Sequence, residues 1–426
     1  MWHVSTRPLD HALNAAAMHR SRFRTALPRL LLALCTLAAL PDSTFSGAPA
    51  TFTALLADGS QAQGELVAVA AGWKLALRRE DGTRQTLDAA KLVRLTRNGG
   101  VPDRPTGPQV VLANGDRIRG SLLSMDEEKL RLRSETAGII ELPLECVYGV
   151  LVAAINEPEA CTELVDAIER RNTDADELWL ANRDRLRGTI VSIDERQITL
   201  DQNGTELRVP RGQVVAIVLN RELISCPPID TLHTVAVLDD GSELRLVSAA
   251  LEGTTLRGQT AFETAVSVPL ERVRMLEFHG GAVAYLSDLQ PASYRHMPYL
   301  GGVRYGWQAD RAIGGSPLSL RGVRYRKGIG VHAHAELVYR LDGQYRLFRA
   351  VVGVDDNTGG GGSVVFVVLV DGKERFRSER LTGHSAPVEV NVPLAGAQEL
   401  RLVVEFADYG DVLDHADWAD AYLVRN

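Results

Sequence analysis

Between residues 52 and 279 the chain repeats one short pattern four times, and this repetition limits the possible folds more than any other feature. Each unit opens with an alternating polar and apolar segment and a tight turn, which is the signature of a β-hairpin. In three units a further glycine follows five positions after the second turn residue, and all four units close with apolar residues spaced five and then three positions apart. The turns are Asp58-Gly59, Asn114-Gly115-Asp116, Asn182-Arg183-Asp184 and Asp240-Gly241-Ser242, and the later glycines are Gly64, Gly120 and Gly188.

Five short strands in about 45 residues fit a small, strongly curved barrel, because closure removes exposed sheet edges. The units also resemble Sm-like or SH3-like barrels in length and turn pattern. We predict β repeats at residues 51–97, 109–152, 177–220 and 233–279. A single continuous β-solenoid is the alternative. A helix is predicted at residues 157–174, where Pro158 precedes an amphipathic run.

Residues 1–50 have the pattern of a signal peptide. Four arginines between residues 20 and 29 precede the eleven-residue apolar run Leu30–Leu40, which is too short to span a bilayer, and Ala48-Pro49-Ala50 supplies a small-residue cleavage site. We therefore predict an extracytoplasmic protein, in the periplasm, at the cell surface or secreted, with no membrane span in the mature chain. Translation from Met18 instead of Met1 is a further hypothesis.

Three cysteines, Cys146, Cys161 and Cys226, follow the predicted signal peptide. An odd number permits at most one intramolecular disulfide, and buried free thiols are the favoured interpretation. The chain carries 47 basic and 54 acidic residues, a formal net charge of −7. This balance argues against nucleic acid as a partner. RNA binding by the Sm-like repeats would have to be salt-sensitive.

From residue 283 onward the apparent strands become longer. The segment Gly359–Val370 begins with four glycines, continues as an almost wholly apolar strand and ends at the turn Asp371-Gly372. Such a strand is expected to be buried on both faces, as in a sandwich of two sheets.

Six motifs in this part of the chain, over about 140 residues, together resemble the NPCBM family of carbohydrate-binding modules. The resemblance implies a galactose-binding-like jelly-roll β-sandwich over residues 283–426 that binds sugar without cleaving it. The motifs are Tyr285-Leu286-Ser287-Asp288, Pro317-Leu318-Ser319-Leu320, Lys327-Gly328-Ile329-Gly330-Val331-His332-Ala333, Phe348-Arg349-Ala350-Val351-Val352-Gly353-Val354-Asp355-Asp356, Val370-Asp371-Gly372 and Asp414-His415-Ala416-Asp417-Trp418-Ala419-Asp420-Ala421.

A sugar site needs an aromatic platform and a few fixed polar groups. Tyr305, Trp307 and Asp310 lie in a polar, glycine-bounded stretch, and Trp307 is the predicted platform, with a core position as its alternative. His334 and Asn357 complete the predicted carbohydrate-binding set. Trp418 is expected in the core.

The resemblance also implies a metal site, because β-sandwiches of this type often hold a structural calcium ion. Similarity in position makes Asp417 and Asp420 the predicted ligands, with Asp288 as a neighbour. The alternative is that Asp417 and Asp420 accept hydrogen bonds from buried backbone amides. A zinc site at His332 and His334 is disfavoured because the sequence places no third ligand.

The sequence shows no GxSxG, HExxH, GxxxxGK[ST] or CxxC signature of an enzyme. We predict a non-enzymatic, exported all-β protein: tandem small β-barrel-like repeats followed by a C-terminal galactose-binding-like jelly-roll β-sandwich that binds carbohydrate. The alternative is a structural or protein-interaction protein of the cell envelope, without sugar binding, in which the repeats provide the contact surface.

Overall fold

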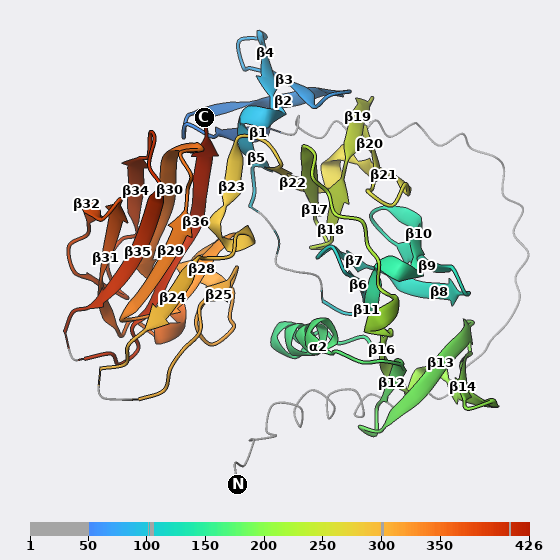
Figure 1. Cartoon of the computed structure of the whole chain (residues 1–426). Coiled ribbons are helices and arrows are strands. Elements are labelled where there is room, and N and C mark those ends of the chain that lie inside the picture. The colour runs from blue at the N-terminus through green and yellow to red at the C-terminus, as the bar shows by residue number, and fades with distance from the viewer. Residues whose placement is uncertain (1–50, 101, 103–105, 300–301, 409) are drawn as a thin grey trace, which may run out of the picture. The chain divides into compact units, whose positions relative to one another are not determined.

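The computed structural model describes residues 51–426 except 101, 103–105, 300–301 and 409, so the predicted signal peptide lies outside the described residues. The chain forms two compact units, and its described residues are mostly in β-strands, as predicted (Figure 1). Of the described residues, the first unit comprises those within 51–54, 61–88 and 94–277, and the second comprises those within 55–60, 89–93 and 278–426. Within the described residues, no helix is both long and apolar enough to cross a membrane.

Each predicted repeat contains five or six strands and a short 3-10 helix before the last strand. The first has β1 (Thr51–Leu56), β2 (Gln61–Ala70), β3 (Lys74–Arg78), β4 (Arg84–Asp88), η1 (Ala89–Lys91) and β5 (Leu92–Arg97). The second has β6 (Gln109–Leu112), β7 (Arg117–Arg119), β8 (Ser121–Met125), β9 (Lys129–Ser134), β10 (Gly138–Pro143), η2 (Leu144–Cys146) and β11 (Val147–Leu151). The third has β12 (Asp176–Leu180), β13 (Arg185–Ile193), β14 (Gln197–Gln202), β15 (Thr205–Pro210), η3 (Arg211–Gln213) and β16 (Val214–Val218), followed by η4 (Arg221–Leu223). The fourth has β17 (His233–Leu238), β18 (Glu243–Leu246), β19 (Ser248–Glu252), β20 (Thr255–Gln259), β21 (Ala265–Pro269), η5 (Leu270–Arg272) and β22 (Val273–His279).

The first and last strands of every repeat pair with each other, as β1–β5, β6–β11, β12–β16 and β17–β22. The last strands also pair between repeats: Val150 of β11 lies opposite Ile217 of β16, and Leu276 of β22 lies opposite Leu95 of β5. These pairings join the second repeat to the third and the fourth to the first. Backbone hydrogen bonds therefore link the repeats, and a 19-stranded sheet runs through all of them.

The recurring glycine has a steric cause in the three repeats where the sequence shows it. A Cβ atom at Gly64, Gly120 or Gly188 would lie 2.6, 2.5 or 2.3 Å from a backbone carbonyl oxygen of the neighbouring strand. No side chain fits at such a distance, so glycine permits the close approach of the two strands.

The predicted helix is α2 (Pro158–Arg170), with proline in its first turn. Its buried face, which includes Leu164, Val165 and Ile168, packs in one apolar cluster with Val111 of β6 and Trp179 of β12. The helix thereby covers the strands of the second and third repeats.

The second unit contains a sandwich of two sheets, as predicted. One sheet has β25 (Gln308–Ala309), β28 (Gly328–His332), β36 (His415–Arg425), β30 (Tyr345–Val354) and β34 (Val388–Pro393) in that order, with β23 (Val283–Tyr285) also on β36. The other has β24 (Ser293–His296), β29 (Ala335–Arg340), β35 (Glu399–Phe406), β31 (Ser363–Val370) and β32 (Lys373–Arg377), with β33 (Leu381–Thr382) on β31. The remaining elements are η6 (Leu286–Asp288), η7 (Asp356–Thr358) and the hairpin of β26 (Leu318–Leu320) and β27 (Val323–Tyr325).

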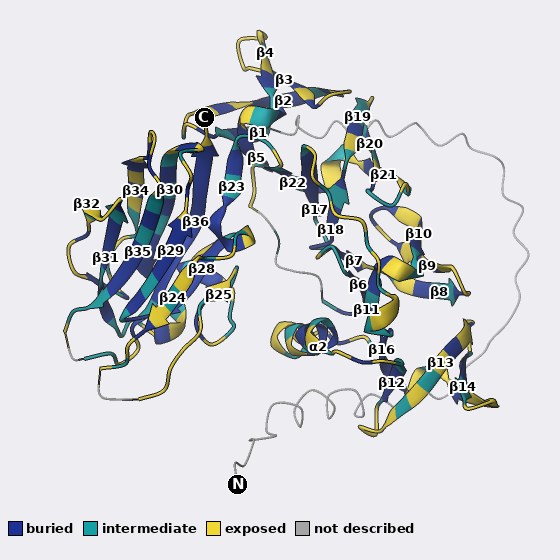
Figure 2. Ribbon diagram, in the orientation of Figure 1, coloured by how far each residue is buried: buried dark blue, intermediate teal, exposed yellow. Residues whose placement is uncertain are grey.

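The two sheets meet in one apolar core, and β36 is buried along nearly its whole length (Figure 2). Trp418 of β36 is fully buried, and its ring lies edge-on to Phe366 of β31 with centroids 5.0 Å apart, so the predicted core position of Trp418 is confirmed. The apolar strand β31 is only partly buried on its outer face, because Val365 and Leu369 are half-buried there.

Candidate functional site

Three histidines from three strand ends form a compact cluster in the sandwich. His296 ends β24, His332 ends β28 and His415 begins β36. His332 and His415 are direct partners in the antiparallel register, with ring centroids 5.5 Å apart, and His296 lies edge-on to His332 at 5.6 Å. We call His296, His332 and His415 the histidine cluster.

Tyr305 covers this cluster. Its ring stacks on His332, with centroids 4.5 Å apart and an interplanar angle of 10°. The Tyr305 backbone N–H donates to His296 Nδ1 at 3.3 Å, and its carbonyl accepts from the Tyr294 hydroxyl at 2.8 Å. Tyr305 nevertheless remains 37% exposed. The protein therefore presents an aromatic ring that is both fixed and accessible.

Asn357, which belongs to η7, connects the cluster to a neighbouring loop. Its Nδ2 donates to the Ile313 carbonyl and the Ser316 hydroxyl, both at 2.9 Å, so its Oδ1 is the atom that accepts from His415 Nδ1 at 2.7 Å. This bond places the His415 proton on Nδ1 and leaves Nε2 as an acceptor.

Two imidazoles of the cluster, those of His296 and His415, favour the neutral form. Burial, followed by the neighbouring His332, lowers the pKa of His415. Burial also lowers the pKa of His296, whose Nε2 donates to the Ala333 carbonyl at 3.1 Å while its Nδ1 accepts from Tyr305. Neutral imidazoles offer both a donor and an acceptor, which suits recognition of uncharged hydroxyl groups.

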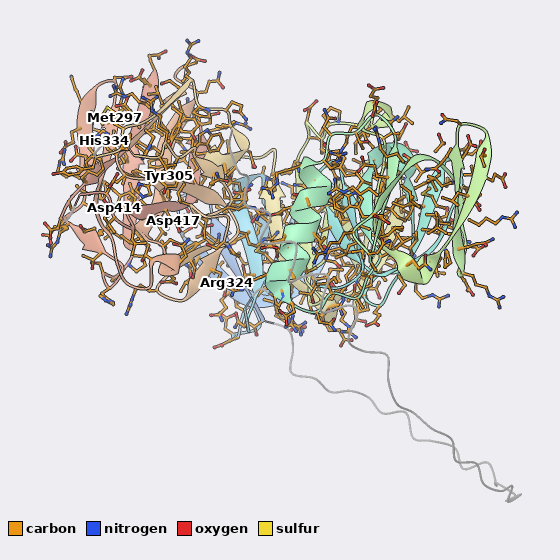
Figure 3. The ribbon with its side chains drawn as sticks, turned by 90° about the horizontal axis from the view of Figure 1, so that it is seen from below. Met297, Tyr305, Arg324, His334, Asp414 and Asp417 are labelled. Atoms are coloured by element: carbon orange, nitrogen blue, oxygen red, sulfur yellow. The ribbon has the colours of Figure 1, made fainter. Side chains whose placement is uncertain are left out.

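Of the predicted carbohydrate-binding residues, Tyr305 and Asn357 lie at this cluster. Trp307 is half-buried and packs against the sandwich core. Asp310 accepts from Lys327 Nζ at 2.7 Å and from the Gly328 backbone at 3.0 Å. His334 is half-buried beside Phe406, and its carbonyl accepts from the Met297 backbone at 2.9 Å; Figure 3 labels both Met297 and His334.

His296 and His415 were not among the predicted site residues, and His332 was predicted to have no role in binding. His332 and His415 both fall within the quoted motifs, so that signal was present in the sequence. Their direct pairing depends on the β28–β36 register, which a single sequence does not reveal.

The three predicted calcium ligands are in different surroundings. Asp288 is exposed and accepts from Lys327 Nζ at 2.6 Å, whereas Asp417 and Asp420 are buried. Burial, followed by the Asp355 carboxyl, raises the pKa of Asp417 well above its usual range, which favours the neutral acid at this position. Among the described residues, no group of three or more His, Cys, Asp or Glu side chains could hold a metal ion. The donor set therefore does not fit a calcium site formed by these three residues.

Asp414, at the start of the last motif, is a second buried carboxyl group. Its Oδ1 accepts from the Ser363 backbone at 2.8 Å, and burial raises its pKa to about 6. Figure 3 labels Asp414 and Asp417 together with Tyr305 in the sandwich.

Comparison with known proteins agrees with the motif analysis. Residues 282–424 match the family described as NPCBM/NEW2 domain. A stretch of 148 residues is 35% identical to a Renibacterium salmoninarum protein named "Putative endo-alpha-N-acetylgalactosaminidase", and covers 32% of this chain and 9% of that protein. A stretch of 115 residues is 30% identical to Alpha-1,3-galactosidase B of Akkermansia muciniphila, and covers 26% of this chain and 14% of that protein. The chain thus spans less than a sixth of the length of the curated relatives that it matches.

Among solved structures, the chain is similar to CBM51 from Clostridium perfringens GH95, determined in complex with methyl-galactose. The two are 35% identical with a TM-score of 0.31, and the match covers 33% of this chain and 99% of the other. The resemblance that the six motifs indicated is confirmed for the C-terminal part of the chain by the family match.

Proposed function

We propose that the NPCBM/NEW2 domain formed by residues 282–424 binds carbohydrate at Tyr305 and the histidine cluster. In this proposal the protein is exported, the domain holds a sugar without cleaving it, and the β repeats act as a spacer or platform. The observation that carries the proposal is the stacked and hydrogen-bonded but accessible ring of Tyr305.

The chemistry of the patch suits a pyranose sugar. One face of such a ring is lined by C–H groups that pack on an aromatic ring, while its hydroxyls need fixed polar partners. Tyr305 supplies the ring, and the neutral imidazole of His415 supplies an acceptor at Nε2. Because Tyr305 and His415 are already held by other residues, little side-chain freedom is lost on binding.

Binding of oligosaccharides by the full chain tests this proposal. Glycans that end in galactose or N-acetylgalactosamine are the first probes, because the names of both curated relatives refer to sugars of that configuration. Replacing Tyr305→Ala should weaken binding about tenfold or more, since the stacking surface is lost. Tyr299→Ala is the matched control, because Tyr299 is 57% exposed and packs edge-on to Phe406 instead.

Two results would overturn the proposal. One is equal affinity in the Tyr305→Ala and wild-type proteins, both folded by circular dichroism. The other is a folded wild-type protein that binds no glycan on a broad array, which would favour the protein-interaction alternative. Release of free sugar from a bound glycan would contradict the non-catalytic assignment, and an exported protein that retains residues 1–50 would contradict the predicted cleavage.

A further inference from the structure

Two of the three cysteines in the described residues lie against each other, although 80 positions separate Cys146 from Cys226 in the sequence. Cys146 is the last residue of η2, and Cys226 lies in the segment between η4 and β17. The Ser225 backbone N–H donates to the Glu145 carbonyl at 2.9 Å, which aligns the two segments. This alignment brings the next residues, Cys146 and Cys226, close enough for each thiol to shift the pKa of the other.

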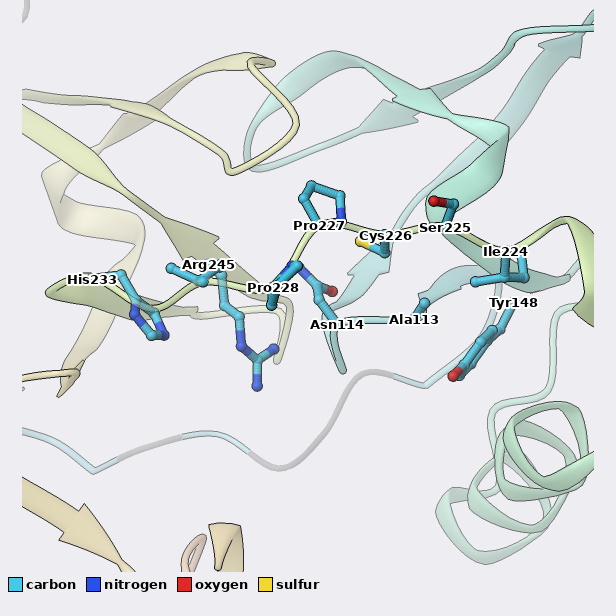
Figure 4. A pocket seen from close by; sticks show the side chains of 11 residues that line it. Ala113, Asn114, Tyr148, Ile224, Ser225, Cys226, Pro227, Pro228, His233 and Arg245 are labelled. Atoms are coloured by element: carbon cyan, nitrogen blue, oxygen red, sulfur yellow. The ribbon is translucent and has the colours of Figure 1, made fainter.

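The two thiols differ in their access to solvent. Cys146 is fully buried, whereas Cys226 is half-buried and lines a pocket of about 440 Å³ (Figure 4). Asn114, Tyr148, His233 and Arg245 line the same pocket. A small molecule that enters the pocket therefore reaches Cys226, whereas Cys146 is not among the lining residues.

The surroundings also make Cys226 the better nucleophile of the two. Its contact with Cys146, assisted by the Asn114 backbone N–H, lowers the pKa of Cys226. The same contact together with burial raises the pKa of Cys146. The thiolate is the reactive form of cysteine, so the direction of these shifts and the greater exposure of Cys226 both favour Cys226 as the first to react.

We propose that Cys146 and Cys226 are a reactive dithiol that a small disulfide, such as oxidised glutathione, converts into an intramolecular disulfide through the pocket at Cys226. The Cys226 thiolate attacks one glutathione sulfur, forms a mixed disulfide and releases glutathione thiolate. Cys146 then loses its proton to that thiolate and attacks the Cys226 sulfur, which breaks the mixed disulfide and releases a second glutathione. Two cysteine thiols are oxidised, and one oxidised glutathione is reduced to two glutathione molecules.

The remaining cysteine provides an internal control. Cys161 lies in α2 within the apolar cluster, is 1% exposed and accepts a hydrogen bond from Gln109 Nε2 at 3.3 Å. It is not among the residues that line the pocket. Among the three cysteines that the structure describes, only the pair Cys146–Cys226 therefore combines neighbouring thiols with access to solvent.

Peptide mapping of the full chain tests the proposal. The protein is incubated with oxidised glutathione, capped with iodoacetamide and cleaved after glutamate under non-reducing conditions. This cleavage places Cys146 in residues 146–159, Cys161 in 160–163 and Cys226 in 223–243. A trypsin digest would leave Cys146 and Cys161 together in residues 134–170 and so could not distinguish them.

The expected product is a disulfide cross-link between the peptides 146–159 and 223–243, and reductant should remove it. The Cys161→Ser variant should form this cross-link as fully as wild type. The Cys226→Ser variant should not form it. Because the disulfide would close the long stretch of chain between Cys146 and Cys226, it should raise the melting temperature of the oxidised protein by about 5–10 °C. Glutathione that stays attached to Cys226 without release, a cross-link involving Cys161, or unmodified Cys226 in the folded protein would overturn the proposal. Should Cys226→Ser fail to fold, Cys146→Ala must instead accumulate the mixed disulfide at Cys226.

Discussion

His332 and His415 lie opposite each other across the β28–β36 pair, and Tyr305 stacks on the His332 ring at 4.5 Å. The relationship connects a loop tyrosine to the ends of two strands in one sheet. Because strand ends are fixed by many backbone hydrogen bonds, the position of the accessible ring is set by the sandwich itself.

Acidification should lower the stability of the protein through His296 and His415 of the histidine cluster. The pKa values of His296 and His415 are lowered by burial, so the neutral forms contribute stability that is present above about pH 6.5 and is lost as the pH falls through the lowered values. We expect the melting temperature to fall between pH 7 and pH 5, and to fall less in His415→Gln, which has no titrating group there. An equal fall in variant and wild type would contradict this assignment.

Asp414 should lower the stability of the protein as the pH rises, the opposite of the effect of the two histidines. Its pKa is raised to about 6, so the stability from its protonated form is complete below about pH 4 and is lost as the pH rises through 6. Asp414→Asn keeps an acceptor for the Ser363 amide but cannot ionise. We expect the variant to gain about 1–3 kcal/mol over wild type between pH 4 and pH 7. Denaturant unfolding at pH 4 and pH 7 measures the difference in unfolding free energy between Asp414→Asn and wild type. The same difference at both pH values would refute the assignment.

The recurring glycine can be tested in the third repeat. A Cβ atom at Gly188 would lie 2.3 Å from the Asp201 carbonyl oxygen, so the β13–β14 strands must separate in Gly188→Ala. We expect a loss of about 2–4 kcal/mol in the free energy of unfolding. Gly212→Ala is the matched control, because no atom outside its immediate neighbours lies within 4 Å of the added Cβ. Similar stability of the two variants would exclude the steric explanation.

Calcium binding by Asp288, Asp417 and Asp420 was predicted from resemblance, and the geometry leads us to expect no effect of calcium through these residues. The melting temperature should be unchanged by excess EGTA, and Asp417→Asn should preserve the fold because burial raises the pKa of Asp417 and so favours an uncharged side chain there. A fall of several degrees with EGTA that is absent from Asp417→Asn would instead support the predicted ion.

Local sequence signals were sufficient to predict several elements of the fold. The turn residues of the four repeats lie between paired strands, as at Gly115 between β6 and β7, where φ is +90°. In the third repeat Arg183 adopts a φ of 75°, a conformation that glycine adopts more readily. The turn therefore forms there with arginine in place of the glycine found in the other repeats. The helix at α2 followed from Pro158 and the amphipathic run.

The candidate site was only partly predictable. Tyr305 was predicted from a polar, glycine-bounded stretch and Asn357 was part of the same predicted set, and both lie at the histidine cluster. Trp307 was the predicted platform, but it packs against the core and is less exposed than Tyr305. Sequence spacing cannot separate these two positions, because the difference depends on which side of the loop faces the sandwich.

The sequence by itself determined the all-β class and the family of the C-terminal part of the chain, because turn residues, alternation and contiguous motifs are local properties of the chain. Tertiary structure alone decided that His332 meets His415 and that Cys146 meets Cys226. Each of these contacts joins segments distant in the sequence, and a shift of one residue in strand register would turn a side chain to the opposite face. Such contacts arise only when the whole set of strands is packed together.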